Sequence, residues 1–216
     1  MCHVLVRCHT GDVTDALLEA WQQHISTDTK LFDRLTSRHR EKHRRYHRLE
    51  HVDNVVRHVR DLAVQESVDD LDAVVAAAMY HDAIYEPESP ANERASGRLA
   101  RRDLAKLAWS EDRINSVVAM VEGTQDHTDP ADIDTSVLFD ADLAILGADE
   151  SNYAAYVTAV RSEYRHLDDQ EWVTGRADVV RSFISRPSIY ATESGRSQWE
   201  DSAQRNLAAE LVSVER

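Results

Sequence analysis

Glycine and proline are scarce in this 216-residue sequence, which contains only six and four of them respectively. A many-stranded fold needs such residues at each chain reversal, so their scarcity argues against one. No alternating strand pattern, internal repeat or linker stands out either. Alanine, leucine, glutamate and arginine abound instead, and these residues favour helix. Because 42% of the residues are hydrophobic, the chain can bury a substantial core. We predict a single all-α domain over residues 1–216, built as a helical bundle.

Cysteine is limited to Cys2 and Cys8. No apolar run reaches the length of a signal-peptide core or of a membrane span. We therefore expect a soluble, cytoplasmic protein with free thiols that contacts no membrane. His3 and His9 each follow a cysteine, so this segment could also hold a metal ion, but no element closes around it.

Positive charge is in short supply, because 39 acidic residues outweigh 25 basic ones and give a formal net charge of −14. The negative electrostatic potential of such a protein repels nucleic-acid phosphates, which argues against a general nucleic-acid binder. The stretch 34–48 is nevertheless rich in arginine. A solvated helix face is the common explanation of such a run, but in an acidic protein it would also draw small anions. It is too short to favour duplex nucleic acid over a nucleotide or another small phosphate.

Apolar residues recur at helical spacing through nearly the whole chain. The clearest amphipathic stripe consists of Val52, Val55, Val56, Val59 and Leu62. Helices are predicted over about 17–25, 31–35, 52–62, 71–82, 92–108, 111–122, 137–147, 150–166, 169–185 and 195–214. Asp69 or Asp70, and Ser110, are suitable N-caps. A homo-oligomer interface would show the same stripes as a core, so the oligomeric state stays open.

His47 and His51 are the first candidate site residues. They are four apart, so on a helix they would share one face beside the valine stripe. Two imidazoles at this spacing can serve a metal ion or a substrate, although the spacing is also common by chance.

A His-Asp dipeptide, His81-Asp82, ends the apolar helix over 71–82. Adjacent helical side chains diverge by about 100°, which suits two cis positions of an octahedral ion. A histidine at a helix C-terminus can instead interact with the helix dipole, but an aspartate there is unfavourable. Because burying either charge without a partner is costly, the dipeptide indicates a metal site.

Asp140 and Asp142 lie within the otherwise apolar segment 137–147. Asp140 can be explained as an N-terminal cap of a short buried helix. Asp142 lies further into the segment, and if it is buried it needs a partner such as a cation.

The order His, then His-Asp, then Asp, each on its own helix, resembles the HD-domain superfamily of metal-dependent phosphohydrolases. The closer resemblance is to a small bacterial group of predicted HD phosphohydrolases. It extends from about residue 38 to the C-terminus and rests on residues 44–47, 51–52, 81–82, 85–87, 92–96, 140–147, 189–190 and 203–207. The resemblance implies an HD-type helical fold with the metal site within about 44–147 and the C-terminal helices 150–214 packed on it.

By position, the resemblance implies four metal ligands: His51, His81, Asp82 and Asp142. In related sequences the last aspartate follows an alanine, which favours Asp142 over Asp140. Two imidazoles and two carboxylates suit a divalent ion such as Mn, Mg, Fe, Co, Ni or Zn. Two positions of an octahedral ion would remain for water and a phosphate oxygen, and the ion would lower the pKa of the water and polarise phosphorus.

The resemblance also implies residues that complete the pocket. His47 matches a histidine that donates a proton to the leaving group in the helical phosphodiesterases, or it contacts phosphate; a surface histidine is the alternative. Glu86 and Glu93 could orient the attacking water or act as a base, although Glu93 also suits a helix start. His127 corresponds to a position that can face the ion or the substrate.

Phosphate binding requires positive charge. Arg44, Arg45 and Arg48 lie beside His47 in the sequence, and Arg161 lies on the predicted helix 150–166. Arg48 and Arg161, together with His127, are therefore predicted to bind substrate. For Arg161 a salt bridge with a carboxylate is the other explanation.

We therefore predict a metal-dependent phosphohydrolase that cleaves a phosphoester or phosphoanhydride of a small anionic substrate, such as a nucleotide. Three alternatives stay open. The chain could be an HD module that binds metal or nucleotide without turnover. It could be a di-iron HD-type oxygenase, with His47 and His127 as additional ligands. It could also be a structural helical adaptor, which would bind no metal.

Overall fold

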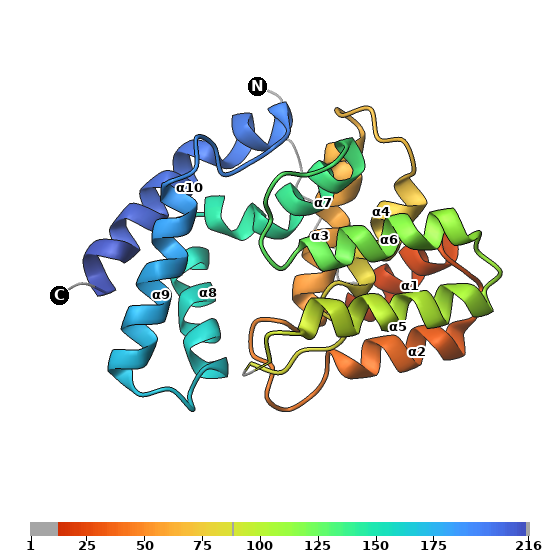
Figure 1. Cartoon of the computed structure of the whole chain (residues 1–216), viewed down its shortest axis with the longest axis horizontal. Helices are drawn as coiled ribbons and strands as arrows, with labels where there is room; N and C mark the ends of the chain where they lie inside the picture. The colour runs from red at the N-terminus through yellow and green to blue at the C-terminus, as the bar shows by residue number, and fades with distance from the viewer. Residues whose placement is uncertain (1–12, 88, 215–216) are drawn as a thin grey trace, which may run out of the picture.

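The computed structural model describes residues 13–87 and 89–214, and within these ranges helices are the only regular secondary structure (Figure 1). The prediction of an all-α protein is confirmed. The elements are α1 (Val13–His24), α2 (Thr29–Arg38), α3 (Leu49–Ala63), α4 (Leu71–Tyr80), α5 (Asn92–Lys106), α6 (Glu111–Gly123), α7 (Ile133–Leu143), the 3-10 helix η1 (Ala144–Gly147), α8 (Glu150–Glu163), α9 (Asp169–Ile184) and α10 (Glu193–Val214). The Cys2 to His9 segment, for which a metal site was considered, lies outside the described residues.

Side-chain caps fix where several helices begin. Asp70 accepts a hydrogen bond from the backbone N–H of Ala73 and opens α4, and Ser110 accepts one from Arg113 and opens α6. Both are among the predicted caps. The same interaction, which satisfies a backbone donor that the helix itself leaves free, starts four other helices at Asp28, Asp132, Asp149 and Asp168.

The core consists of two clusters of buried apolar side chains. The first gathers residues of α1 to α7 around α4, in which every residue from 73 to 80 is buried. The valine stripe of α3 packs there as predicted. The second cluster joins the end of α7 and η1 to α8, α9 and α10. Trp199 of α10 packs against both clusters, so the C-terminal helices contact the helices that carry the candidate site.

Asp140 holds the start of α10 against α7. Its Oδ1 accepts the backbone N–H of Ala191 at 2.7 Å, and its Oδ2 accepts that of Thr192 at 2.8 Å. The interpretation of Asp140 as the cap of its own helix is therefore wrong. α7 begins seven residues before Asp140 at Ile133, because Asp132 is its N-cap.

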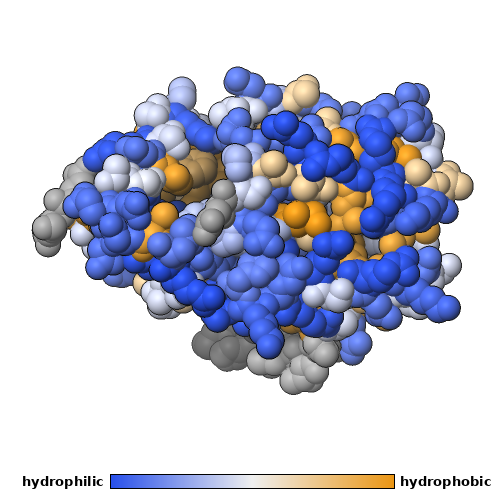
Figure 2. All heavy atoms as spheres, turned by 60° about the horizontal axis from the view of Figure 1, so that its bottom comes forward, coloured by the Kyte–Doolittle hydropathy of each residue, from blue (hydrophilic) through white to orange (hydrophobic). Residues whose placement is uncertain are grey.

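The surface is largely hydrophilic on the face that Figure 2 shows, with apolar atoms exposed in a few places. Within the described residues, no helix is both long and apolar enough to cross a bilayer.

Candidate metal centre

Four side chains from three parts of the chain converge beside α3. His51 projects from α3, His81 and Asp82 follow the last residue of α4, and Asp142 lies in the last turn of α7. One ligand atom each from His51, His81 and Asp142 lies within 4.8 Å of the other two, an arrangement that could hold a metal ion. His51 Nε2 lies 3.1 Å from Asp142 Oδ1 and 3.1 Å from His81 Nε2.

Asp82 completes this group, which we call the His-Asp cluster: His51, His81, Asp82 and Asp142. Its Oδ2 lies 3.1 Å from His81 Nε2 and 3.4 Å from His51 Nε2. All four residues that the sequence predicted as ligands are therefore brought together. The helix that carries the dipeptide ends at Tyr80, and His81 is its C-cap.

The donor atoms of the cluster fit a cation. His81 Nδ1 lies 2.8 Å from the carbonyl oxygen of Ala78, which only accepts, so in the neutral ring Nδ1 carries the proton. The other ring nitrogen, Nε2, then directs a lone pair toward the carboxylates of Asp82 and Asp142, whose oxygens are also hydrogen-bond acceptors only. Such buried acceptors need a positive charge between them, and a divalent ion supplies it.

The pKa values of the cluster residues also indicate that the carboxylates need a positive charge beside them. Burial opposes the negative charge of Asp82 and Asp142, but the adjacent imidazoles keep the pKa of both carboxyl groups well below their usual range. Burial also opposes protonation of His81, yet the two carboxylates raise the pKa of this imidazole well above its usual value. Without a metal ion, protonated imidazoles would have to balance the carboxylates.

Arg44 fixes the backbone on which the cluster is built. Its guanidinium is buried, and Nη1 donates to the carbonyl oxygens of Asp82 at 2.7 Å and His47 at 3.1 Å. Nη2 donates to the carbonyl oxygen of Ala83 at 3.3 Å. Arg44 was considered as a phosphate ligand, but its donors are occupied by the chain itself.

His47 lies in the loop before α3 and not on a helix. α3 begins at Leu49, with Arg48 as its N-cap, so the shared helical face predicted for His47 and His51 does not exist. The two rings nevertheless lie close, with centroids 5.7 Å apart. His47 Nε2 lies 4.0 Å from Asp82 Oδ2, at the edge of the His-Asp cluster.

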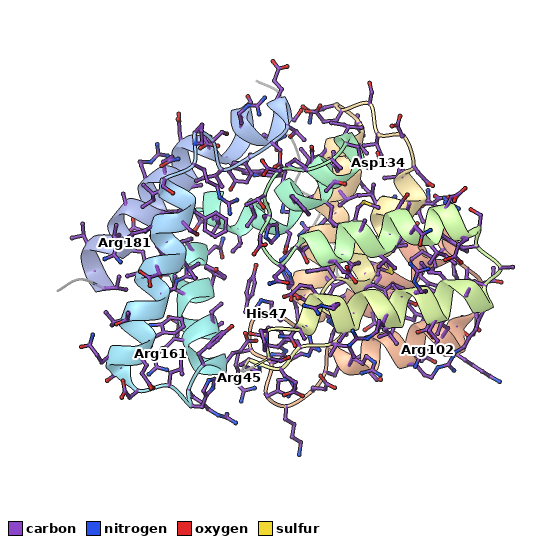
Figure 3. The ribbon with its side chains drawn as sticks, viewed as in Figure 1. Arg45, His47, Arg102, Asp134, Arg161 and Arg181 are labelled. Atoms are coloured by element: carbon purple, nitrogen blue, oxygen red, sulfur yellow. The ribbon has the colours of Figure 1, made fainter. Side chains whose placement is uncertain are left out.

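Glu163 on α8 is the residue that holds His47, and the sequence analysis missed it. Its Oε1 accepts the three successive backbone N–H groups of residues 45, 46 and 47, at 2.6, 2.8 and 3.1 Å. Its Oε2 lies 2.7 Å from His47 Nδ1 and accepts the hydroxyl of Tyr85 at 2.9 Å. Figure 3 shows His47 in the region between α8 and the helices of the first cluster.

The charge of Glu163 is strongly stabilised. Burial opposes its ionisation, but the hydrogen bonds with His47 and with the backbone of Arg45 lower the pKa from 4.5 to about 2. Helical spacing along α8 could have predicted that Glu163 faces inward. Tyr156, Val160 and Glu163 are four and three apart and share one face, which places the carboxylate inside.

A small cavity of about 330 Å³ opens beside the cluster on the side of His47. Asp82, Asp142, Glu93 and His127 also line it. His127 Nε2 lies 2.8 Å from Asp142 Oδ2, and its backbone has a φ of 49°, which is uncommon for a residue other than glycine. His127 and Glu93, which the resemblance placed at the pocket, thus line the same cavity, and Glu93 also lies in the first turn of α5.

The remaining predicted residues lie apart from this small cavity. Glu86 is exposed and borders a different cavity. Arg48 is exposed and lines a larger cavity on the other side of the cluster. Arg161 binds the carbonyl oxygen of Tyr164 at 2.9 Å and the carboxylate of Asp169 at 2.9 Å.

Arg161 thus ties the turn between α8 and α9, and Figure 3 shows it away from His47. The salt bridge that the sequence allowed as an alternative is present with Asp169. Arg161 borders none of the cavities described beside the cluster, because Glu163, two residues further along α8, takes the inward position.

No protein-family model, curated protein or solved structure matches this chain. Any function has to be inferred from the residues of the cluster and their contacts.

Proposed function

We propose that this protein is a metal-dependent phosphohydrolase of the HD type. The observation that carries the proposal is the convergence of two imidazoles and two carboxylates from α3, the end of α4 and α7. Nε2 of each imidazole lies 3.1 to 3.5 Å from an oxygen of each carboxylate. Their order along the chain is that of the HD superfamily. The donor set suits a divalent ion of intermediate hardness.

His51, His81, Asp82 and Asp142 would hold the ion. When bound, such an ion lowers the pKa of a coordinated water and polarises a phosphoryl oxygen. The surrounding residues shield the two imidazoles from bulk water, since His51 and His81 are 4% and 1% exposed, while Asp82 and Asp142 line the small cavity. Metal-ligating imidazoles are usually oriented by their other ring nitrogen, and the bond of His81 with the Ala78 carbonyl does this.

His47 would move the proton in the reaction. Glu163 binds its Nδ1, which fixes the ring with Nε2 directed to the side of Asp82. A histidine held in this way by a carboxylate can exchange a proton at its free nitrogen. Glu93 and His127 line the same cavity and can orient a water molecule there.

The proposal is tested by metal content and hydrolysis together. We expect the purified full chain to contain about one divalent ion, and Asp82→Ala to lose it. A phosphate-release screen over nucleotides and sugar phosphates, with Mn, Mg, Co and Ni, should find a substrate. His47→Ala should keep the ion but slow turnover by about 10²- to 10⁴-fold.

Two results would contradict parts of this proposal. Full metal retention by Asp82→Ala would remove Asp82 from the ligand set, and unchanged turnover in His47→Ala would remove His47 from the chemistry. A protein that binds the ion but hydrolyses nothing in the screen would instead be the non-catalytic HD module.

A di-iron oxygenase is the second candidate function, and it is favoured by one feature. Two further imidazoles adjoin the cluster, because His127 Nε2 lies 2.8 Å from Asp142 and His47 Nε2 lies 4.0 Å from Asp82. Two iron ions need more ligands than four residues provide, and these histidines would supply them. Iron content near two per chain, with an optical spectrum typical of paired irons, would support this function over hydrolysis.

A further inference from the structure

The large cavity on the other side of the cluster has a volume of about 730 Å³, within the range of small-molecule sites. Two helices form its facing walls, each with residues at positions i, i+3, i+4 and i+7. The wall from α3 consists of His51, Asn54, Val55 and His58, and that from α8 of Asn152, Ala155, Tyr156 and Ala159. Asp142 borders this cavity as well as the small one, so both cavities reach the cluster.

The residues that line the cavity change in chemical type along α3. Arg45 and Arg48 border it near the start of the helix, next to His51 of the cluster. His58 and Trp199 border it two turns further on, about 10 Å along the helix axis. Burial and the charge of Arg57 lower the pKa of His58, which keeps this imidazole neutral. Arginine side chains thus border one end of the cavity, and the rings of His58 and Trp199 border the other.

The end at His58 offers ring surfaces, because Trp199 and His58 lie in an edge contact with centroids 5.2 Å apart. Tyr156 of α8 also lines the cavity, with its ring centroid 4.7 Å from that of Tyr46. Such surfaces favour a flat ring through stacking or edge contacts. Besides Asp142 of the cluster, the carboxylates of Glu50 and Asp149 border the cavity, and they disfavour a second negative group on the substrate.

Two alanines of α8, Ala155 and Ala159, line the cavity with small side chains. Glu163 of the same helix binds residues 45 to 47, so Ala159, one turn before it, lies at the arginine end, and Ala155 lies a further turn toward Trp199. The small cavity offers much less space, and the acidic residues Asp82 and Glu93 line it without a lysine or arginine among its described residues.

We propose that the organic part of the substrate lies in the large cavity, with its phosphate at the His-Asp cluster and an uncharged, flat ring system toward Trp199 and His58. The proposal rests on the proposed function and names the class of phosphate ester that it takes. Ala155 then limits the size of the ring that the cavity accepts. Water enters from the small cavity, on the side of His47.

The test uses the full chain loaded with the metal ion, and titration calorimetry with two probes, 1-naphthyl phosphate and inorganic phosphate. Ala155→Trp places a large side chain in the cavity, while Ala154→Trp makes the same change at the neighbouring, also exposed position, which borders a different groove. We expect Ala155→Trp to bind 1-naphthyl phosphate about tenfold more weakly or worse, and inorganic phosphate within about twofold of the original protein. Ala154→Trp should bind both probes normally.

Equal affinity of Ala155→Trp and the original protein for 1-naphthyl phosphate would overturn the proposal, as would the absence of any binding by the original protein. If Ala155→Trp does not fold, the smaller change Ala155→Phe replaces it. Hydrolysis is measured in parallel. Size-dependent binding without hydrolysis would contradict the proposed function but support the cavity assignment, and hydrolysis with no effect of Ala155→Trp would do the reverse.

Discussion

Asp140 and Asp142 show how two residues of one type, two positions apart, take different roles. On a helix they diverge by about 200°, so they face different neighbours. Asp140 faces the chain that enters α10 and accepts two of its backbone N–H groups. Asp142 faces His51 and His127, at 3.1 and 2.8 Å. The first is a structural anchor and the second a candidate metal ligand.

A matched pair of substitutions separates these roles. We expect Asp142→Asn to lose most of the bound ion, because an amide is a weak ligand without charge, while it folds normally. Asp140→Asn should keep the ion but lower the free energy of unfolding by about 1–3 kcal/mol, since one of its two backbone donors loses its acceptor. Metal analysis and urea unfolding of both variants measure the outcome. Loss of the ion from Asp140→Asn alone would reverse the assignment.

At the scale of elements, η1 and α10 pack so closely that a glycine is required between them. A Cβ added to Gly147 would lie 2.9 Å from both Cα and the carbonyl oxygen of Trp199, which are backbone atoms and cannot turn aside. Gly175 in α9 is the opposite case, because it is exposed and a Cβ there would meet nothing within 4 Å.

These two glycines give opposite predictions for the same substitution. Gly147→Ala should lower the free energy of unfolding by about 1–3 kcal/mol, because α10 has to shift. Gly175→Ala should raise it by about 0.5–1 kcal/mol, because alanine restricts the unfolded chain and favours helix. Thermal unfolding of the two variants checks the signs. If Gly147→Ala instead raises the free energy of unfolding, α10 can move away from η1 at little cost and the prediction is wrong.

At the scale of the whole molecule, Glu163 joins the C-terminal helices to the site. It lies at the end of α8, yet its carboxylate holds the loop before α3 through three backbone N–H groups. Arg186 makes a second such link, from the chain after α9 to the carbonyl oxygens of Asp126 and His127 at 2.8 Å each. The position of the C-terminal helices therefore affects both His47 and His127.

The link through Glu163 predicts a dependence of stability on pH. The folded state lowers the pKa of this carboxyl group from 4.5 to about 2, so the unfolded state binds the proton more readily. The contribution, about 3 kcal/mol, is present above pH 4.5 and is lost as the pH falls toward 2. Urea unfolding at pH 6 and pH 3 should show a smaller loss of stability for Glu163→Gln than for the original protein. Identical losses would contradict this role.

Much of the fold was predictable because its signals are local. Helical spacing of apolar residues and the caps at Asp70 and Ser110 depend on neighbours within a few residues, and both predictions are confirmed. His47 shows the limit of such signals. Its spacing from His51 predicted a shared helical face, but a carboxylate more than one hundred residues away holds it in a loop.

The sequence by itself determined that the chain is helical and which histidines and aspartates stand at the ends of its helices, since local periodicity and residue chemistry are enough for both. Only the tertiary structure shows that the four residues implied by the resemblance meet. It also set Asp140 against the start of α10 and placed Glu163 rather than Arg161 inside. The reason is physical: the direction of a side chain depends on the phase of its helix and on how that helix packs against segments far away in the sequence.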